Sequence, residues 1–249
     1  MPDVFSQVWA LDGLVWLIAA AFVAGTVRGF SGFGTAMIYL PIAAQVIDPI
    51  WCIATLAVMD IFGPLPNMPS ALRNGHPRDL VRLGIAVVVT IPIGLIVLFA
   101  IDPAVFRVAV ALISLALLAC LVGGVRYKGE VTRSMVFGIG GAAGLLGGAT
   151  GTPGPPVILF YMARPIPASA IRANVMAFLF FYDAIVLVML ALRGALTASI
   201  VALGLVLAVP NVLGNLLGAA IFRPERERAY KIVAYLIIAA SALSALPIW

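Results

Sequence analysis

Apolar segments long enough to enter a membrane follow one another along almost the whole chain. Only 10% of the 249 residues are charged, against roughly 25% in soluble domains, and the mean hydropathy is +1.16. At about 20 residues per full crossing, the chain has room for about eight to ten complete or partial crossings. The sequence therefore predicts an all-α integral membrane protein without a separate soluble domain. The apolar segments cover approximately residues 8–27, 35–47, 50–71, 80–101, 104–124, 132–148, 155–163, 168–192, 196–222 and 229–248.

Two glycine-rich breaks interrupt these segments at matching places in the two halves of the chain. The first covers residues 25–34 and the second residues 144–156. Paired helix breaks in matching halves of a membrane protein are the best sequence indicator of a transporter's binding site. We therefore expect two membrane repeats, over residues 1–125 and 126–249, that form a single transport domain. A shift of 119 positions superposes three pairs of glycines: Gly25 with Gly144, Gly29 with Gly148, and Gly32 with Gly151.

The basic residues discriminate between two topologies. If residues 8–47 and 132–163 are each one long broken span, the loop Lys and Arg residues divide seven against seven across the membrane. If each is a helical hairpin that enters and leaves on one side, with the N-terminus outside, twelve lie inside and two outside. Cytoplasmic loops carry an excess of Lys and Arg, so the hairpins are favoured. The outside pair is Arg107 and Arg193, and the inside set is Arg73, Arg78, Arg82, Arg126, Lys128, Arg133, Arg164, Arg172, Arg223, Arg226, Arg228 and Lys231.

The hairpin topology predicts inverted repeats. Each half then contains one hairpin with a Gly-rich tip and three transmembrane helices, and an odd number of full crossings inverts the second half. The segments 35–47 and 155–163 are too short to cross roughly 30 Å of hydrocarbon at 1.5 Å per residue. Their tips are therefore expected near the middle of the membrane, where non-helical backbone is tolerated only inside protein or along a cavity.

The breaks also predict an anion site. A helix that begins near Thr35 or Pro155 directs its N-terminal N–H groups and about half a positive charge into the gap. We expect the substrate to bind between the tips, near the midplane. The alternative is that the glycines serve only close helix packing. The candidate substrate-binding residues are Arg28, Gly29, Ser31, Gly32, Phe33, Gly34, Thr35, Ala149, Thr150, Gly151, Thr152, Pro153 and Gly154.

Three charged residues are candidates for a role inside the membrane. Arg28 is the sole basic residue within a break, and its guanidinium suits sulfonate, carboxylate or phosphate oxygens. It can instead form an ion pair with Asp60 or extend to the membrane surface. Asp60, in the middle of segment 50–71, and Asp183, in segment 168–192, are candidates for proton coupling or for an ion pair. The two carboxylates do not align under the 119-residue shift.

No pattern in the sequence predicts an enzyme. There is no Ser/His/Asp set, no phosphate loop with a lysine and only one histidine, so we expect no catalytic residues, metal or cofactor. The basic residues lie in short loops, which argues against a nucleic-acid partner. The N-terminal segment lacks Lys and Arg and does not predict a signal peptide. A passive anion channel, a cation carrier that uses both carboxylates, and a lipid-acting membrane enzyme remain as alternatives.

The two breaks resemble the Gly-rich motifs of the sulfite exporter TauE/SafE family, also called the TSUP family. The motifs are residues 29–34 with Pro41, and residues 147–156, and the similarity covers nearly the whole chain. Both depart from the plainer Gly-Gly-Gly form that is common in that family. The resemblance implies transport of sulfite, an organosulfonate or another small organic anion across the bacterial inner membrane. It implies neither a coupling ion nor an oligomeric state.

Overall fold

The computed structural model describes residues 2–65, 68–124, 132–164, 166–223, 225 and 227–247. Over this part of the chain all regular structure is helical, which confirms the predicted all-α class. The expected repeat boundary at residues 125 and 126 lies outside the described residues. The helices are α1 (Pro2–Trp9), α2 (Leu14–Ser31), α3 (Thr35–Ala43), α4 (Pro49–Asp60), α5 (Met68–Asn74), α6 (Pro77–Ala100), α7 (Pro103–Val122), α8 (Arg133–Thr150), α9 (Gly154–Met162), α10 (Ala168–Leu192), α11 (Ala198–Ile221) and α12 (Glu227–Ser244).

Five of the described helices are long enough and apolar enough to cross a membrane. They are α2, α6, α7, α11 and, over Ala170–Leu192, α10. Large hydrophobic side chains on these helices face outward, as shown by Val89 of α6 and Leu216 of α11, which are 65% and 62% exposed. Long helices with an apolar outer surface are stable in lipid, where the backbone must satisfy its own hydrogen bonds. The chain is therefore a multi-pass integral membrane protein.

The prediction of one continuous span over residues 50–71 is wrong. Helix α4 ends at Asp60 and α5 begins only at Met68. Gly63 and Pro64 lie between them, and a proline has no N–H with which to continue a helical hydrogen-bond ladder. With 12 residues, α4 is about 18 Å long and cannot cross the hydrocarbon alone. Asp60 consequently lies at a helix C-terminus and not in the middle of a span.

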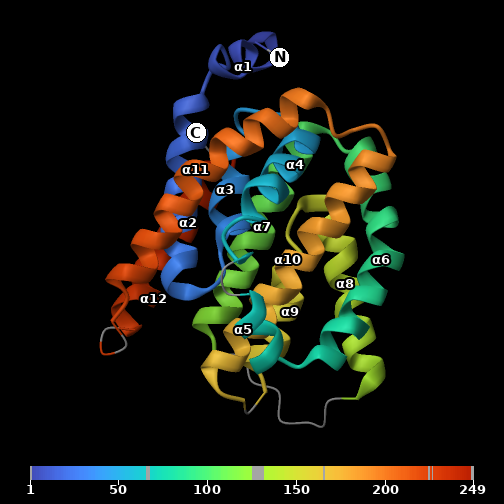
Figure 1. Cartoon of the computed structure of the whole chain (residues 1–249), viewed down its shortest axis with the longest axis vertical. Helices are drawn as coiled ribbons and strands as arrows, with labels where there is room; N and C mark the ends of the chain where they lie inside the picture. The colour runs from blue at the N-terminus through green and yellow to red at the C-terminus, as the bar shows by residue number, and fades with distance from the viewer. Residues whose placement is uncertain are drawn as a thin grey trace.

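Each of the two broken helix pairs begins and ends at one end of the molecule. In Figure 1, α2 starts at the upper end and α3 returns to it, and Leu11 shares a surface pocket with residues 44–48. The pair α8 and α9 starts and ends at the lower end. There Arg164, just after α9, pairs with Asp79 in the first turn of α6, at 2.8 Å. The two pairs thus insert into the molecule from opposite ends.

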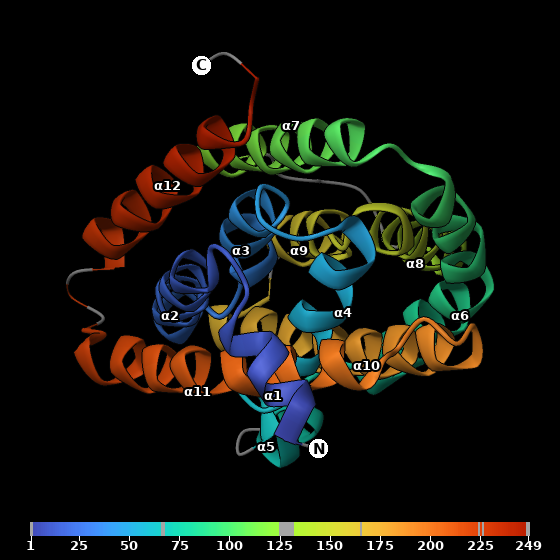
Figure 2. The same cartoon turned by 90° about the horizontal axis from the view of Figure 1, so that it is seen from above.

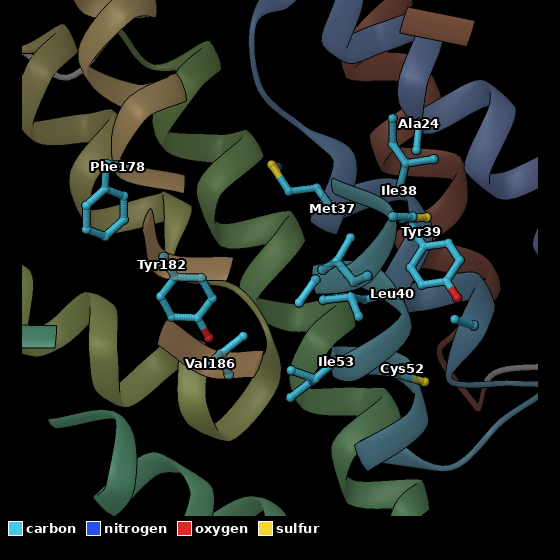
Figure 3. Close-up of a cluster of buried hydrophobic side chains, with 14 of the residues drawn as sticks. Ala24, Met37, Ile38, Tyr39, Leu40, Cys52, Ile53, Phe178, Tyr182 and Val186 are labelled. Carbon is cyan, nitrogen blue, oxygen red and sulfur yellow. The ribbon is translucent and has the colours of Figure 1, made fainter. Parts of the chain in front are cut away.

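The interior of the molecule contains α3, α4 and α9. Figure 2 shows α7 and α12 on one side of these helices and α10 and α11 on the other. α3 is apolar on all sides, and its residues Ile38, Tyr39 and Leu40 are fully buried, as expected for a helix without a polar face. In Figure 3, Tyr182 of α10 lies across the core from these side chains, with Ile53 of α4 also in the cluster. The short helices that follow the glycine breaks therefore lie in the core.

Glycines within α2 and α8 allow these helices to pack closely against helices of the other half of the chain. A Cβ atom added at Gly29 of α2 would overlap the backbone oxygen of Asn215 on α11. One added at Gly148 of α8 would lie 2.7 Å from the backbone oxygen of Ile91 on α6. Such contacts require residues without side chains. Close packing, the alternative to a binding role, therefore accounts for the glycines inside the helices.

Apart from the buried Arg28, most of the described basic residues lie at the lower end of the view in Figure 1, where α6, α8, α10 and α12 begin. Arg107 and Arg193 instead lie near the upper end, at the start of α7 and just after α10. Arg126, Lys128 and Arg226, which entered the charge count, lie outside the described residues. The basic residues at the lower end are Arg73, Arg78, Arg82, Arg133, Arg164, Arg172, Arg223, Arg228 and Lys231.

Candidate functional site

The two glycine breaks meet at a small cavity in the core. Its volume is about 40 Å³, close to the roughly 30 Å³ that one water molecule occupies in the liquid. Both breaks line it, together with side chains of α4, α7 and α10. A sulfonate group is larger than a water molecule, so an anion can enter only if the breaks move apart. The lining residues are Gly34, Thr35, Ala36, Met37, Leu56, Asp60, Leu117, Gly151, Thr152, Pro153, Gly154, Pro155, Ile158, Leu179 and Asp183.

The first break presents the N-terminal turn of α3 to this cavity. Gly32 and Gly34 have φ angles of +83° and +105°, which side chains disfavour, and they separate α2 from α3. The Ser31 hydroxyl is engaged within the break itself, at 2.7 Å from the Val27 oxygen and 2.6 Å from the Phe33 oxygen. The donors that this break offers to the cavity are therefore the N–H groups at the start of α3 and the Thr35 hydroxyl.

The second break presents fewer N–H groups. Gly151 has a φ of +72° and ends α8, and Pro153 and Pro155 flank the first residue of α9. Proline has no N–H, so the start of α9 offers fewer donors than the start of α3. The Thr150 and Thr152 hydroxyls lie 2.7 Å apart, and both side chains are buried. This break therefore presents the Thr152 hydroxyl, bonded to Thr150, in place of N–H donors.

Arg28 forms an ion pair with Asp60 beside the cavity. Its Nη1 lies 2.5 Å from Asp60 Oδ2, and the two side chains are 4% and 8% exposed. The same nitrogen lies 3.4 Å from the Thr35 hydroxyl. The sequence left open an ion pair with Asp60 or an Arg28 side chain that extends to the membrane surface. The structure has the ion pair, and the Arg28 side chain is buried. Within the described residues, Arg28 Nη2 and Asp60 Oδ1 are buried and have no hydrogen-bond partner.

Asp183 lies on the same cavity as Asp60, although the two are 123 positions apart in the sequence. It projects from the middle of α10 and is 6% exposed. Its Oδ2 is buried and has no hydrogen-bond partner among the residues that the structure describes. No ion pair with Asp183 occurs within the same residues, so its charge lacks the compensation that Arg28 gives Asp60.

The remaining candidate residues lie away from the small cavity. Gly29 packs against α11, and Ala149 lies at the contact between α8 and Gly94 of α6. Thr150 donates to the Leu146 oxygen at 2.8 Å and reaches the cavity only through Thr152. The other three, Ser31, Gly32 and Phe33, line a second and larger cavity.

The second cavity has a volume of about 360 Å³ and lies toward the basic end of the molecule. Ile158 of α9 lines both cavities, so the first break and this residue separate them. Arg172 lies beside Gly32, with its guanidinium carbon 5.8 Å from the centre of the Phe222 ring. The walls are largely apolar and aromatic, and Arg172 and Lys231 supply positive charge. The lining residues are Phe30, Ser31, Gly32, Phe33, Ile158, Met162, Ile171, Arg172, Val175, Phe222, Tyr230, Lys231, Ala234 and Tyr235.

Sequence reasoning missed this cavity. Arg172 and Lys231 entered only as loop charges, and Tyr230 and Tyr235 were not singled out. One pattern could have indicated it: Arg172 and Lys231 lie near the starts of two helices that were predicted to begin on the same side of the membrane. Nothing in the sequence indicated that α10 and α12 bring those turns to the first break.

Comparison with known proteins identifies the family. No curated protein and no solved structure matches the chain. The family model described as Sulfite exporter TauE/SafE matches residues 17–245, which include both glycine breaks, both buried aspartates and both cavities. The match covers far more than half of the 249 residues and agrees with the resemblance of the two motifs. The chain therefore belongs to the sulfite exporter TauE/SafE family.

Proposed function

We propose that the protein is a secondary transporter that exports a small anion, such as sulfite or an organosulfonate, bound between the two glycine breaks. One observation carries the proposal: the starts of α3 and α9 converge on one buried cavity from opposite ends of the molecule. Helix N-termini attract anions through their N–H groups and their dipole. In a transporter of this kind, half-helices that meet inside the membrane form the substrate site.

We further propose that the two halves are inverted repeats. Three pairs of corresponding helices have equal lengths: α2 and α8 have 18 residues, α3 and α9 have nine, and α6 and α11 have 24. The packing is reciprocal, because α2 lies against α11 and α6 lies against α8. Such repeats support alternating access, in which one half moves relative to the other around a fixed site.

The distribution of charge supports an orientation in the membrane. With the basic end in the cytoplasm, both broken pairs satisfy the positive-inside rule, and the first and last helices reach the outside. The larger cavity then lies on the cytoplasmic side of the site, where an exported anion would be collected. We propose the bacterial inner membrane as the location. Labelling of single cysteines at the two ends of the chain tests this orientation, and labelling from the cytoplasmic side alone would contradict it.

The central test is anion binding by the purified protein. A ligand that binds only the folded state raises the unfolding free energy by about 2.7 kcal/mol at a hundred times its dissociation constant. We expect sulfite or short sulfonates to raise the melting temperature, and sodium, potassium and magnesium chlorides at equal ionic strength to leave it unchanged. Stabilisation by cations and not by these anions would favour a cation carrier that uses Asp60 and Asp183.

Counterflow in liposomes tests the transport step. Liposomes that contain a carrier and are preloaded with unlabelled anion accumulate labelled anion transiently. A passive channel gives large single-channel currents and no such accumulation. A lipid-acting membrane enzyme would instead convert lipid in the same liposomes. Either of those results, without counterflow, would overturn the proposed function.

A further inference from the structure

The small cavity contains more negative than positive side chains. Asp60 and Asp183 line it, and Arg28 adjoins it through Asp60. The Arg28–Asp60 pair is neutral as a unit, with Nη1 at 2.5 Å from Oδ2. If Asp183 is also ionised, the three side chains carry a net charge of −1. An anion that enters from the larger cavity then meets a carboxylate without a counter-charge.

The surroundings of Asp183 supply no other compensating charge. On its own helix its neighbour is Tyr182, whose hydroxyl lies against Gly147 of α8. From α9 and the second break it faces Ile158 and Thr152, which are uncharged. The ionisable groups of α5 and α6, which also contact α10, belong to the basic end, where Asp79 pairs with Arg82 and Arg164. Among the described residues, the charges that act on Asp183 are therefore those of Asp60 and Arg28.

We propose that the transporter moves one proton with each anion in the same direction, and that Asp183 carries the proton. Export then runs down the outward gradient of the anion and is not driven by the proton gradient. The proposal rests on the proposed anion site between the glycine breaks. An ionised Asp183 and a bound anion repel each other inside a cavity of low polarity, where charges are poorly screened. Protonation removes that repulsion. Because the two binding events favour each other, each must strengthen the other by the same factor.

The chemistry is a proton transfer without any change in the anion. On the side where the cavity opens, a carboxylate oxygen of Asp183 takes a proton from water, and the O–H group can donate to an oxygen of the anion. After the change of access, the anion leaves and the proton returns to water on the other side. For a monovalent anion the step moves no net charge across the membrane. Asp60 cannot replace Asp183 in this role while Arg28 holds it.

The experiment measures internal pH during anion uptake into liposomes that contain the purified protein and a trapped pH-sensitive dye. Ethanesulfonate is the probe, because its acid is so strong that it cannot itself carry a proton through the lipid. With no initial pH gradient, an inward gradient of ethanesulfonate is expected to acidify the interior at one proton per anion taken up. An imposed membrane potential is expected to leave the uptake rate unchanged.

Three variants locate the proton. Asp183→Asn is expected to abolish the acidification, and Asp183→Glu, which retains a carboxyl group, is expected to restore it. Asp12→Asn, in an exposed loop, is the control and should behave like the unmodified protein. Acidification by Asp183→Asn equal to that of the control would show that Asp183 is not the carrier.

The outcomes separate this proposal from the proposed function. Uptake of labelled ethanesulfonate without acidification, and with a response to membrane potential, overturns proton coupling and leaves the anion carrier intact. Failure to take up ethanesulfonate, sulfite or methanesulfonate in counterflow overturns the carrier itself. Because the unmodified protein alone answers both questions, neither depends on a variant that folds poorly.

Discussion

The break after α2 and the break after α8 bend the backbone in the same way but contribute different groups to the small cavity. Gly32 and Gly151 have φ angles of +83° and +72°. Each donates its N–H to a carbonyl oxygen four residues earlier, at 2.7 Å: that of Arg28 in the first break and that of Gly147 in the second. The turn that ends each helix is therefore conformationally equivalent in the two halves.

The side chains differ. The first break adjoins the Arg28–Asp60 ion pair and a proline-free helix start with N–H donors. The second has no charged residue, and its prolines lack N–H donors, but the Thr152 hydroxyl lines the cavity and is bonded to that of Thr150. A repeated backbone shape thus leaves each half free to specialise. The first break brings the Arg28–Asp60 pair and N–H donors to the site, whereas the second half brings a hydroxyl group from its break and the unpaired carboxylate of Asp183 from α10.

The largest effect is expected from Arg28→Ala. The substitution leaves Asp60 buried without its partner, and loss of one member of a buried ion pair costs about 3–5 kcal/mol. We expect a large fall in the melting temperature of the detergent-solubilised protein, together with a loss of counterflow.

A double variant separates stability from anion binding. Arg28→Gln with Asp60→Asn replaces the ion pair by two neutral polar side chains, so most of the stability should return. Counterflow should stay low if Arg28 Nη2 contacts the anion. Full recovery of both would reduce the pair to a structural role, and unchanged stability of Arg28→Ala would contradict the importance of the pair.

Valine at the two equivalent glycines should affect the halves unequally. A Cβ at Gly151 would lie 2.9 Å from Ile53 Cγ1 and 3.0 Å from Leu40 Cδ1, inside the core. At Gly32 the nearest atom, at 3.1 Å, is Nε of the flexible Arg172 side chain. Each substitution also places a side chain at positive φ, which costs about 1–3 kcal/mol. We expect Gly151→Val to reduce counterflow and the melting temperature more than Gly32→Val does.

Gly194 provides the matched control for these variants. Its φ is +67°, and an added Cβ would have no atom of the described structure within 4 Å. Gly194→Val therefore reports the backbone strain alone. Near-normal transport by both Gly32→Val and Gly151→Val would show that the breaks serve packing only, and the proposed site would fail.

Thr152→Val tests the hydroxyl contribution of the second break. It removes one member of the Thr150–Thr152 pair and should cost about 1 kcal/mol of stability. In the closed cavity Thr152 donates to Thr150, whose own hydrogen goes to the Leu146 oxygen. If the Thr152 hydroxyl turns to the anion when the breaks move apart, its loss should raise the KM of transport about tenfold, since a hydrogen bond to a charged group contributes about 1.5–3 kcal/mol. Ser31→Ala is the counterpart in the first break and should change KM little, because Ser31 lines the larger cavity and not the small one. Equal effects of the two variants would remove this difference between the halves.

The sequence predicted the elements that local chemistry determines. Gly32, Gly34 and Gly151, with the prolines that follow Gly151, interrupt helices wherever they lie, and lipid-length apolar runs predict helices. Gly63 and Pro64 are local signals that divide segment 50–71 into two helices. The prediction gave more weight to the hydrophobicity of the segment than to these two residues. In that segment a missed turn signal, and not a long-range effect, explains the error.

The composition of the site depends on packing that no local pattern contains. Asp60 and Asp183 reach one cavity because α4 ends at the first of them and α10 crosses the core beside it. The repeat shift of 119 residues aligns Asp60 with Leu179 and not with Asp183, so the internal symmetry did not predict that the two aspartates line one cavity. Arg28 was correctly identified as an unusual charge, and its contact with Asp60 was one of the alternatives. The sequence alone does not distinguish an Arg28 that pairs with Asp60 from an Arg28 that binds a substrate anion.

The smallest effect is expected from Arg172→Gln, which extends the comparison to the cavity beside the first break. Arg172 is exposed, lines the larger cavity and lies 3.5 Å from the Gly29 oxygen through Nη2, so it is available to attract an anion before the small cavity opens. Exposed charges act weakly and are screened by salt over about 10 Å at 0.1 M. We expect KM to rise about two- to fivefold at low ionic strength, with kcat unchanged, and the difference to vanish at high salt.

Arg223→Gln is the matched control for Arg172→Gln. Arg223 is exposed and belongs to the same basic end, but it does not line the cavity. If both variants raise KM equally, the attraction comes from the general charge of the cytoplasmic surface. If only Arg172→Gln does so, the larger cavity is the route by which anions reach the first break. Positive charge from both halves would then act on the anion, with Arg172 of the second half collecting it and Arg28 of the first half setting the charge of the site together with Asp60.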